Sequence, residues 1–448
     1  MPTRSSLSMI QRATMTRGGK FAATSFILAM SGWSHSWCFL SSPANALVQS
    51  EIASSTSGPT LLWQRKYEKI AHAAISADGS RIAVSEESGL LRYCDRHGKE
   101  LWSFKYAKPG VPKGVTKPTD KTRIRYCSLT RTGDFMACTL ERLRTWQQEV
   151  TDTAKWYIFV DTMTGHFPES ILYFDSRGKL MWESKEGGYP QISQDGKLVF
   201  VEPRATELGE ESLDNFRLFD SNGKMLWEEQ GTPHPRAGIS DDGAYIYTRD
   251  SIFDKTHRVH WKCGQYESIA KIHEKYVLTV RFEPTGNPYP NQYIGRFRTY
   301  ELGSMKLLWE REDARLGTSD PDIDFDYMTG YLLSDKLLVR AGEQKSEGNV
   351  EIFAHDVATG KTITNWLTRS VFQVSLFSVS EDGNAILLER KPTVDSPSEI
   401  GLYGLQGLKR WAIKASGVSY LIVAKAGKTF AAVFDNGISV YDNSEDMP

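Results

Sequence analysis

The feature that most limits how this chain can fold is a repeated pair of turns between short apolar runs. In the copy at residues 192–227, the sequence Ser-Gln-Asp-Gly at 193–196 precedes the apolar run Leu198–Val201, and Asp-Ser-Asn-Gly at 220–223 precedes Trp227. Asp can hydrogen-bond its own backbone and Gly supplies a positive φ, so each turn predicts a hairpin. Together the two hairpins predict a four-stranded antiparallel sheet.

The first turn of this unit recurs along the chain. Five copies are clear and three are degenerate, which makes eight openings. The clear copies lie at residues 76–79, 130–133, 193–196, 240–243 and 380–383, and the degenerate ones at 273–275, 334–336 and 424–427. Repeats of roughly 40 to 50 residues are typical of propeller blades.

The closing strands of these units carry tryptophan, and they too number eight. They contain Trp63, Trp102, Trp182, Trp227, Trp261, Trp309, Trp366 and Trp411. The strand at Trp63 has no opening half, and the opening at 424–427 has no closing strand. Pairing the two termini in one sheet would close a ring and remove its edges. We therefore predict an all-β, eight-bladed β-propeller with terminal strand closure, or seven blades if one degenerate unit forms no sheet.

Consecutive apolar residues mark the closing strands, as in Leu101-Trp102 and Met181-Trp182. Successive residues of a strand point to opposite faces. We therefore expect neighbouring blades to cover both faces of these strands.

Three copies of the closing half share the pattern Asp-x-x-Gly-Lys-x-x-Trp, at residues 95–102, 175–182 and 220–227. The pattern resembles the repeat of quinoprotein-like (PQQ-like and WD40-like) β-propellers, and the resemblance covers roughly residues 60–443. In that family the tryptophans dock against neighbouring blades. Its members include pyrroloquinoline-quinone dehydrogenases, non-catalytic envelope scaffolds and the barrel-assembly propeller of the outer membrane. The resemblance implies a fold and leaves the function open.

Composition argues against several functions. The formal net charge of −1 gives no electrostatic footprint for nucleic acid. A quinoprotein dehydrogenase should carry adjacent cysteines, and the sequence has no Cys-Cys pair. The repeated Asp residues occupy one turn of successive units, which favours turn capping over catalysis. We predict a protein without enzymatic activity or cofactor, with a diverged quinoprotein-type oxidoreductase or another propeller enzyme as the alternative.

The N-terminal region resembles an export signal. Basic residues precede the apolar run 21–30, which is short for a membrane span, and Ala44-Asn45-Ala46 has the small residues of a cleavage site. We predict an export presequence at 1–46, a linker at 47–59, the propeller at 60–443 and a tail at 444–448, with a periplasmic or extracellular location. An uncleaved anchor or a disordered tail at the N-terminus is the alternative.

Five cysteines are present, and two of them, Cys127 and Cys138, flank one predicted hairpin turn. Alignment with the sister turns places Cys127 opposite Ala137 and turns Cys138 to the other face. This register predicts two buried thiols, with a cross-strand disulfide as the alternative.

Insertions that break the repeat are the best candidates for partner binding, because loops on a rigid scaffold often carry it. They lie at 105–121, 143–169 and 287–293; plain variation in loop length is the alternative. The candidate contact residues are Lys108, Lys113, Lys117, Trp146, Trp156, Tyr289 and Tyr293.

An acidic run offers a candidate metal site. Its alternate residues, Asp320, Asp322, Asp324 and Asp326, would face the same way in an extended segment and could collect Ca²⁺. The EF-hand pattern requires Gly where Phe325 stands, so a solvated connecting loop is the alternative.

These observations predict an exported, monomeric binding scaffold with a protein or glycan partner in the cell envelope. The mature chain would have no membrane span. Sensing of a small ligand in the central funnel is a further alternative.

Overall fold

Thirty-two β-strands and no helix make up the part of the chain that a computed structural model describes. The described residues belong to one compact unit, Asn45–Pro448. They are 58–106, 121–152, 157–203, 215–230, 237–284, 293–313, 331–345, 349–370, 374–380, 383–393, 395–414, 416–425 and 427–443. The predicted presequence and tail lie outside them.

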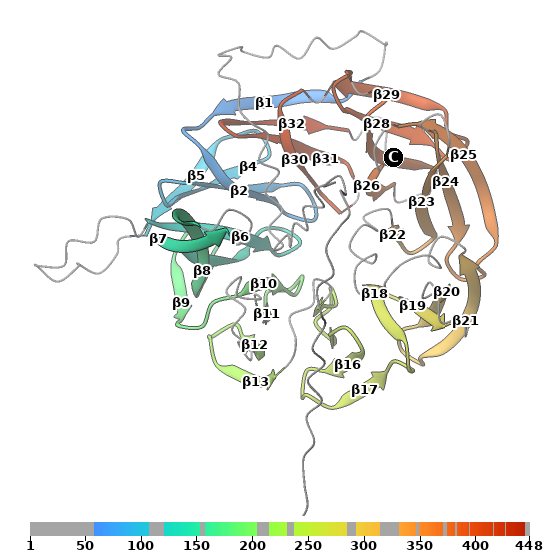
Figure 1. Ribbon diagram of the computed structural model, residues 1–448, viewed down its shortest axis with the longest axis horizontal. Helices are drawn as coiled ribbons and strands as arrows, with labels where there is room; N and C mark the ends of the chain where they lie inside the picture. Colours follow the sequence, from blue (N-terminus) through green and yellow to red (C-terminus); the bar gives the residue numbers. More distant parts are fainter. Residues whose placement is uncertain are drawn as a thin grey trace, which may run out of the picture. The chain divides into compact units, whose positions relative to one another are not determined.

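The strands form eight four-stranded antiparallel sheets, and Figure 1 shows that these follow one another around a ring in chain order. Blades 1 to 4 contain β2 (Ile70–Ile75), β3 (Arg81–Glu86), β4 (Leu90–Asp95), β5 (Glu100–Lys105); β6 (Lys121–Leu129), β7 (Phe135–Asp152), β8 (Tyr157–Asp175), β9 (Leu180–Ser184); β10 (Tyr189–Ile192), β11 (Leu198–Glu202), β12 (Asn215–Asp220), β13 (Met225–Gln230); and β14 (Gly238–Ile239), β15 (Tyr245–Tyr247), β16 (Ser251–Asp254), β17 (Val259–Lys262).

Blades 5 to 8 complete the ring. They contain β18 (Glu267–His273), β19 (Tyr276–Pro284), β20 (Tyr293–Glu301), β21 (Lys306–Asp313); β22 (Tyr331–Leu333), β23 (Leu337–Lys345), β24 (Asn349–Asp356), β25 (Thr362–Arg369); β26 (Ser375–Val379), β27 (Ala385–Arg390), β28 (Glu399–Gly404), β29 (Lys409–Lys414); and β30 (Val418–Val423), β31 (Thr429–Phe434), β32 (Gly437–Asp442), β1 (Thr60–Lys66). The prediction of eight blades is confirmed.

Blade 8 joins the two ends of the propeller. Its outermost strand, β1, pairs antiparallel with β32, from Thr60 opposite Asp442 to Lys66 opposite Gly437. An N-terminal strand thus completes a sheet whose other three strands are C-terminal, so the predicted closure of the ring is confirmed. In every blade the first strand is innermost and the last lies at the rim (Figure 1).

The core consists of eight apolar clusters, and each lies between two adjacent blades. One cluster joins Leu91 and Tyr93 of blade 1 to Met136 and Phe174 of blade 2, all with at most 1% of their surface exposed. The cluster between blades 8 and 1 joins β31 and β32 to β2 and β3. Because neighbouring blades share their cores, the apolar surface of each sheet is buried only once the ring is complete.

Aspartates cap the turns between third and fourth strands. Asp95 Oδ1 accepts hydrogen bonds from the backbone N–H groups of His97 and Lys99, both at 2.9 Å. Asp175 and Asp220 accept the equivalent pairs in blades 2 and 3. This is the capping function expected of the repeated aspartates.

Tryptophans connect most blades to the next one. Trp102 Nε1 donates to the backbone carbonyl of Ser176 at 3.0 Å, and its indole lies over Gly178, where a Cβ atom would come within 2.6 Å of Cδ2. Equivalent indole hydrogen bonds join Trp63 to Arg96 at 2.9 Å, Trp182 to Ser221 at 3.2 Å, Trp309 to Val357 at 2.7 Å and Trp411 to the Asn443 side chain at 3.0 Å.

The remaining three tryptophans pack by other contacts. Trp366 lies over Gly407, where a Cβ would come within 2.7 Å of the indole. Trp227 meets His257 instead of a glycine, and the two rings stack with centroids 4.6 Å apart. Trp261 lies 5.1 Å from the ring of Tyr300.

The prediction that both faces of the closing strands are covered is wrong. Leu101, Met181 and Leu226 are 42%, 46% and 41% exposed, although the tryptophan that follows each of them packs against the next blade. These strands lie at the rim, where radial blades diverge, so one face of the strand loses its cover.

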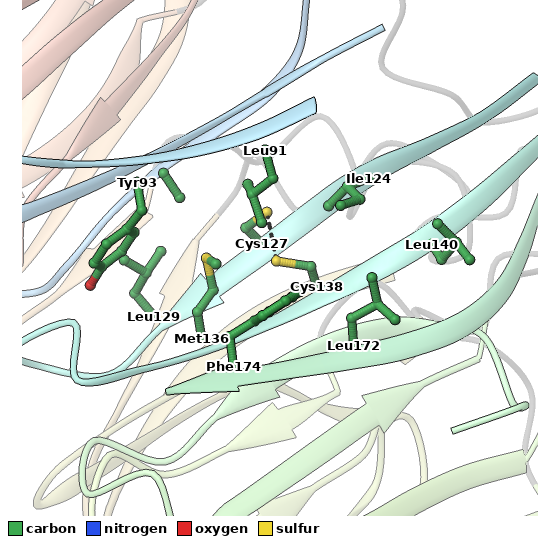
Figure 2. Packing of buried hydrophobic residues seen from close by; sticks show 11 residues of the cluster. Leu91, Tyr93, Ile124, Cys127, Leu129, Met136, Cys138, Leu140, Leu172 and Phe174 are labelled. Carbon is green, nitrogen blue, oxygen red and sulfur yellow. Dashed lines mark hydrogen bonds between the residues drawn. The ribbon is translucent and has the colours of Figure 1, made fainter. Parts of the chain in front are cut away.

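The predicted register of Cys127 and Cys138 is also wrong, although both thiols are free and buried. Ser128, and not Cys127, lies opposite Ala137, because the pairing of β6 with β7 shifts by one residue between Arg125 and Ser128. The shift is a β-bulge, and it turns Cys127 toward Cys138 (Figure 2).

Candidate functional site

The propeller has two sides that differ in how the chain crosses them. Strands alternate in direction within each blade. The turns after the first and third strands therefore lie on one side, here called the turn side. The loops after second strands and the links between blades lie on the other, here called the connection side.

The segments predicted to bind a partner or a metal all follow a second or a fourth strand in chain order. Residues 105–121 stand between β5 and β6, 143–169 belong to β7, β8 and the turn between them, 287–293 stand between β19 and β20, and 320–326 stand between β21 and β22. Of these segments, the structure describes the hairpin of β7 and β8 and the ends of the flanking strands.

The hairpin of β7 and β8 is the largest regular feature of the connection side. Its pairing continues from Leu140 opposite Ser170 to Asp152 opposite Tyr157. The described part of β6 pairs with β7 only as far as Leu143. The nine residue pairs beyond, residues 144–152 with 157–165, form a two-stranded arm about 30 Å long at ~3.4 Å per residue.

The register of the arm mixes apolar and polar pairs. Trp146 lies opposite Met163 and Val150 opposite Phe159, and the pair of Gln148 with Asp161 stands between them. The alternate pairs are Thr145 with Thr164, Gln147 with Thr162, Glu149 with Val160 and Thr151 with Ile158.

Ionic contacts anchor the base of the arm. Arg123 of β6 and Glu141 of β7 pair at 2.8 Å, and the Glu141 side chain is fully buried. Arg123 also pairs with Glu87 of blade 1, and Arg125 Nη1 lies 3.6 Å from Glu141. A buried carboxylate requires such partners, so these contacts hold the strand that continues into the arm against two neighbours.

Inner strands of blades 8, 1 and 2 meet at a cluster of aromatic rings. The His72 ring lies 5.7 Å from that of Tyr126 and 6.3 Å from that of Tyr420. The Tyr420 hydroxyl accepts a hydrogen bond from the Ala73 N–H at 2.7 Å, and His72 Nδ1 accepts one from the Cys127 N–H at 3.3 Å. These contacts satisfy backbone groups on the inner edges of β2 and β6.

On the turn side, the inner turns meet around the axis. The Lys425 N–H donates to the carbonyl of Ala77 at 3.0 Å, and Gln194 N–H donates to that of Asp241 at 2.8 Å. The Lys425 ammonium, from blade 8, pairs with Asp241 of blade 4 and lies 2.8 Å from Glu274 of blade 5. Because blades 4 and 8 are opposite in the ring, a side chain crosses the axis at this end.

The cavity found at the junction of β1 and blade 1 has a volume of about 430 Å³. Arg92 lies in its wall and pairs with Glu86 and Glu100, each at 2.8 Å. The charge of Arg92 is neutralised by these two carboxylates. The cavity lies where β1 meets blade 1, so we assign it to the closure of the ring.

Comparison with known proteins gives structural matches only. No protein-family model matches the chain. No curated protein matches its sequence. The structure of BamB from Moraxella catarrhalis matches with a TM-score of 0.50 at 12% sequence identity, over 86% of this chain and 100% of that chain. The C-terminal WD40 domain of Sif2 matches with a TM-score of 0.50 at 11% identity, over 87% of this chain and 99% of that chain.

The chain has the fold of BamB and WD40 β-propellers. The resemblance seen in the Asp-x-x-Gly-Lys-x-x-Trp repeat is thereby confirmed for the fold. At these identities the likeness concerns the fold alone, so the function must be argued from the residues of this propeller.

The structure describes the backbone of two of the seven predicted partner residues. Trp146 and Tyr293 are backbone positions of β7 and β20. The others lie outside the described residues: Lys108, Lys113, Lys117, Trp156 and Tyr289.

The four aspartates predicted to bind a metal, Asp320, Asp322, Asp324 and Asp326, also lie outside the described residues. Within the described ranges, no three His, Cys, Asp or Glu residues form a group suited to a metal ion. The described part of the chain also contains no helix long and apolar enough to cross a membrane.

Sequence reasoning missed the aromatic cluster around His72 and the ionic contact across the axis. These residues carry no motif; His72 is 348 residues from Tyr420, and Lys425 is 184 residues from Asp241. The insertion at 143–169 was the signal that could have revealed the long hairpin of β7 and β8.

Proposed function

We propose that this propeller is a protein-binding scaffold and that the arm of β7 and β8 is its main partner-binding element. The observation that carries the proposal is the continuation of the hairpin for nine residue pairs past the described end of β6. A two-stranded ribbon is only marginally stable by itself, so a partner that pairs with it would stabilise it.

The structure of the arm suggests the chemistry of the partner. Beyond Leu143 no described strand pairs with the edge of β7 that faces β6. An edge without a neighbouring strand can accept an extended segment of another protein by main-chain hydrogen bonds, and alternate side chains add specificity. The partner is therefore a protein that offers an extended segment.

Replacing residues 144–165 by Asn-Gly tests the proposal, because Leu143 and His166 are paired and a two-residue turn would connect them. We expect the shortened propeller to fold and to lose its partner in affinity purification followed by crosslinking. The partner should then bind a synthetic hairpin of residues 144–165.

Two matched variants separate the aromatic residues of the arm from its polar ones. Trp146→Thr with Phe159→Thr removes one aromatic residue from each strand, and Gln147→Ala with Thr162→Ala changes one polar pair. We expect the first to weaken binding at least tenfold and the second to change it less than threefold. Equal effects would refute binding through the aromatic residues, and a partner retained by the shortened propeller would refute the arm as the binding element. A glycan in place of a protein would be revealed by loss of capture after glycosidase treatment.

We further propose that the protein is exported and that its partner lies in the cell envelope. The basic and apolar segments at residues 1–46 and the small residues at 44–46 support this proposal. N-terminal sequencing of the protein from fractionated cells would test it, with a mature start near Leu47 as the expected result. A cytosolic protein that retains residues 1–46 would contradict it.

A further inference from the structure

Two thiols on neighbouring strands of blade 2 are in direct contact. The Sγ atoms of Cys127 on β6 and Cys138 on β7 lie 2.9 Å apart, and Figure 2 shows the two side chains pointing toward each other inside the core. Cys127 is 8% exposed and Cys138 is fully buried. Cys94 and Cys263 are the other free thiols of the described residues.

A local irregularity of β6 creates this contact. From Lys121 to Arg125 the register would place Cys127 opposite Ala137, but Ser128 takes that place. Tyr126 absorbs the extra residue with a φ of 52°, a conformation that non-glycine residues seldom adopt. The chain therefore adopts an uncommon backbone at the position that brings the two sulfurs together.

The surroundings distinguish the two thiols. The Cys138 S–H donates a hydrogen bond to Cys127 Sγ, and this bond lowers the pKa of Cys127. Burial opposes the change, and the neighbouring His72 lowers the pKa further. Burial raises the pKa of Cys138, and the neighbouring Cys127 raises it further. Cys127 is therefore the thiol suited to attack first, and Cys138 the one suited to resolve the product.

We propose that Cys127 and Cys138 form a dithiol–disulfide site that is oxidised by exchange with a disulfide of another protein or of a small thiol. The bulge places Tyr126 and Cys127 together opposite Cys138, and the two sulfur atoms are already in contact. The bond can therefore form between neighbouring strands that are already paired.

The exchange balances without another reagent. The Cys127 thiolate attacks one sulfur of R–S–S–R, forms a mixed disulfide and releases R–S⁻. The Cys138 thiol then loses its proton, attacks the Cys127 sulfur and releases the second R–S⁻. Two thiols are oxidised, one disulfide is reduced, and the released thiolates take up the two protons.

The disulfide would link the inner strand of blade 2 to the strand that continues into the arm. It would also fix the bulge and with it Tyr126, whose ring lies 4.4 Å from Tyr189 in an edge-on contact. Oxidation would thereby stiffen the inner part of the blade on which the arm is mounted.

The test equilibrates the full-length protein with glutathione and glutathione disulfide at a series of ratios. Free thiols are then blocked, and peptides are mapped by mass spectrometry. We expect one Cys127–Cys138 peptide pair with a mass two hydrogens below the reduced form, and a melting temperature raised by on the order of a few degrees. Dithiothreitol should reverse both changes.

Variants and a second route of oxidation complete the test. Cys127→Ser and Cys138→Ser should remove the mass change and the thermal shift, whereas Cys94→Ser should retain both. Because the pair is buried, the protein is also denatured, reduced and refolded in the same buffers. If neither route yields the Cys127–Cys138 pair, or if Cys94 or Cys263 replaces one partner, the proposal is refuted.

Discussion

The two sides of the propeller use the same strands for different purposes. On the turn side, most blades meet the next through a short capped turn such as that of Asp175, with Trp102 over Gly178. On the connection side, the hairpin of β7 and β8 continues past its pairing with β6 into the arm. Regular contacts between neighbours thus lie on one side, and irregular extensions lie on the other.

This difference teaches how a repeat protein separates stability from recognition. A turn that is repeated in successive blades contributes to successive interfaces between blades. A substitution in such a turn therefore changes the stability of the ring. An extension of one hairpin is not part of any interface beyond its base, so it can vary without cost to the fold.

The largest effect should come from opening the ring. Deletion of residues 59–67 removes β1, which pairs with β32 and carries the Trp63 contact to Arg96. We expect a loss of more than the roughly 3–5 kcal/mol typical of one buried Trp, measured by chemical denaturation. Gln64→Ala, at an exposed position of the same strand, is the control. An unchanged denaturation midpoint would show that closure does not hold the ring together.

Gly178→Ala should show how much one turn contributes to the free energy of unfolding. Gly178 has a φ of 78°, and a Cβ would come within 2.6 Å of Trp102. We expect a loss of about 2–4 kcal/mol from backbone strain and displacement of the indole. Gly417→Ala is the matched control, because its φ is 72° and nothing lies within 4 Å of the added Cβ. If the two variants unfolded at the same denaturant concentration, the packing of Trp102 over the turn would contribute nothing.

The shortened arm should have a much smaller effect on stability. Replacing residues 144–165 by Asn-Gly leaves the Arg123–Glu141 pair at the base intact. We expect the free energy of unfolding to change by less than about 1 kcal/mol, within the range of surface changes. Glu141→Gln is the contrasting variant, since breaking a buried pair costs about 3–5 kcal/mol. A large loss on shortening the arm would mean that the connection side also holds the ring together.

The smallest effect should come from the ionic contact across the axis. The hydrogen bond from Lys425 lowers the pKa of Glu274 from its usual 4.5. The unfolded chain therefore binds this proton at higher pH, and the contribution to stability is full above about pH 4.5 and disappears as the pH falls through the lower folded value. Glu274→Gln should remove less than about 1 kcal/mol at pH 7 and a smaller amount at pH 3, as measured by denaturation at both values. An equal change at both pH values would exclude this ion pair as the cause.

Turn chemistry explains why so much of the fold could be predicted. A Ser-x-Asp-Gly or Asp-x-x-Gly turn is stabilised by atoms a few residues apart, so its residues indicate its position directly. The eight openings indicated the number of blades. The N-terminal closing strand without an opening and the C-terminal opening without a closing strand indicated the closure. The exposure of Leu101 and Met181 could not be predicted in this way, because it depends on how far neighbouring blades diverge at the rim.

The candidate site was predictable only as a set of segments. The insertion at 143–169 stood out because it breaks the repeat, and Trp146 marked it as a candidate for binding. That it is a continuous two-stranded arm follows from pairing between residues 144–152 and 157–165, which no turn motif specifies.

The sequence by itself predicted eight blades, with seven as the alternative, and determined their order and the pairing of the two ends, because local turns and strand periodicity depend on neighbouring residues. Only the tertiary structure decided that Cys127 faces Cys138, that Lys425 reaches Asp241 across the axis, and that His72 meets Tyr420. The last two contacts join residues from different blades, and the first depends on a single-residue bulge in one strand. A bulge and a contact between distant blades are settled by packing, and packing exists only when the whole propeller has formed.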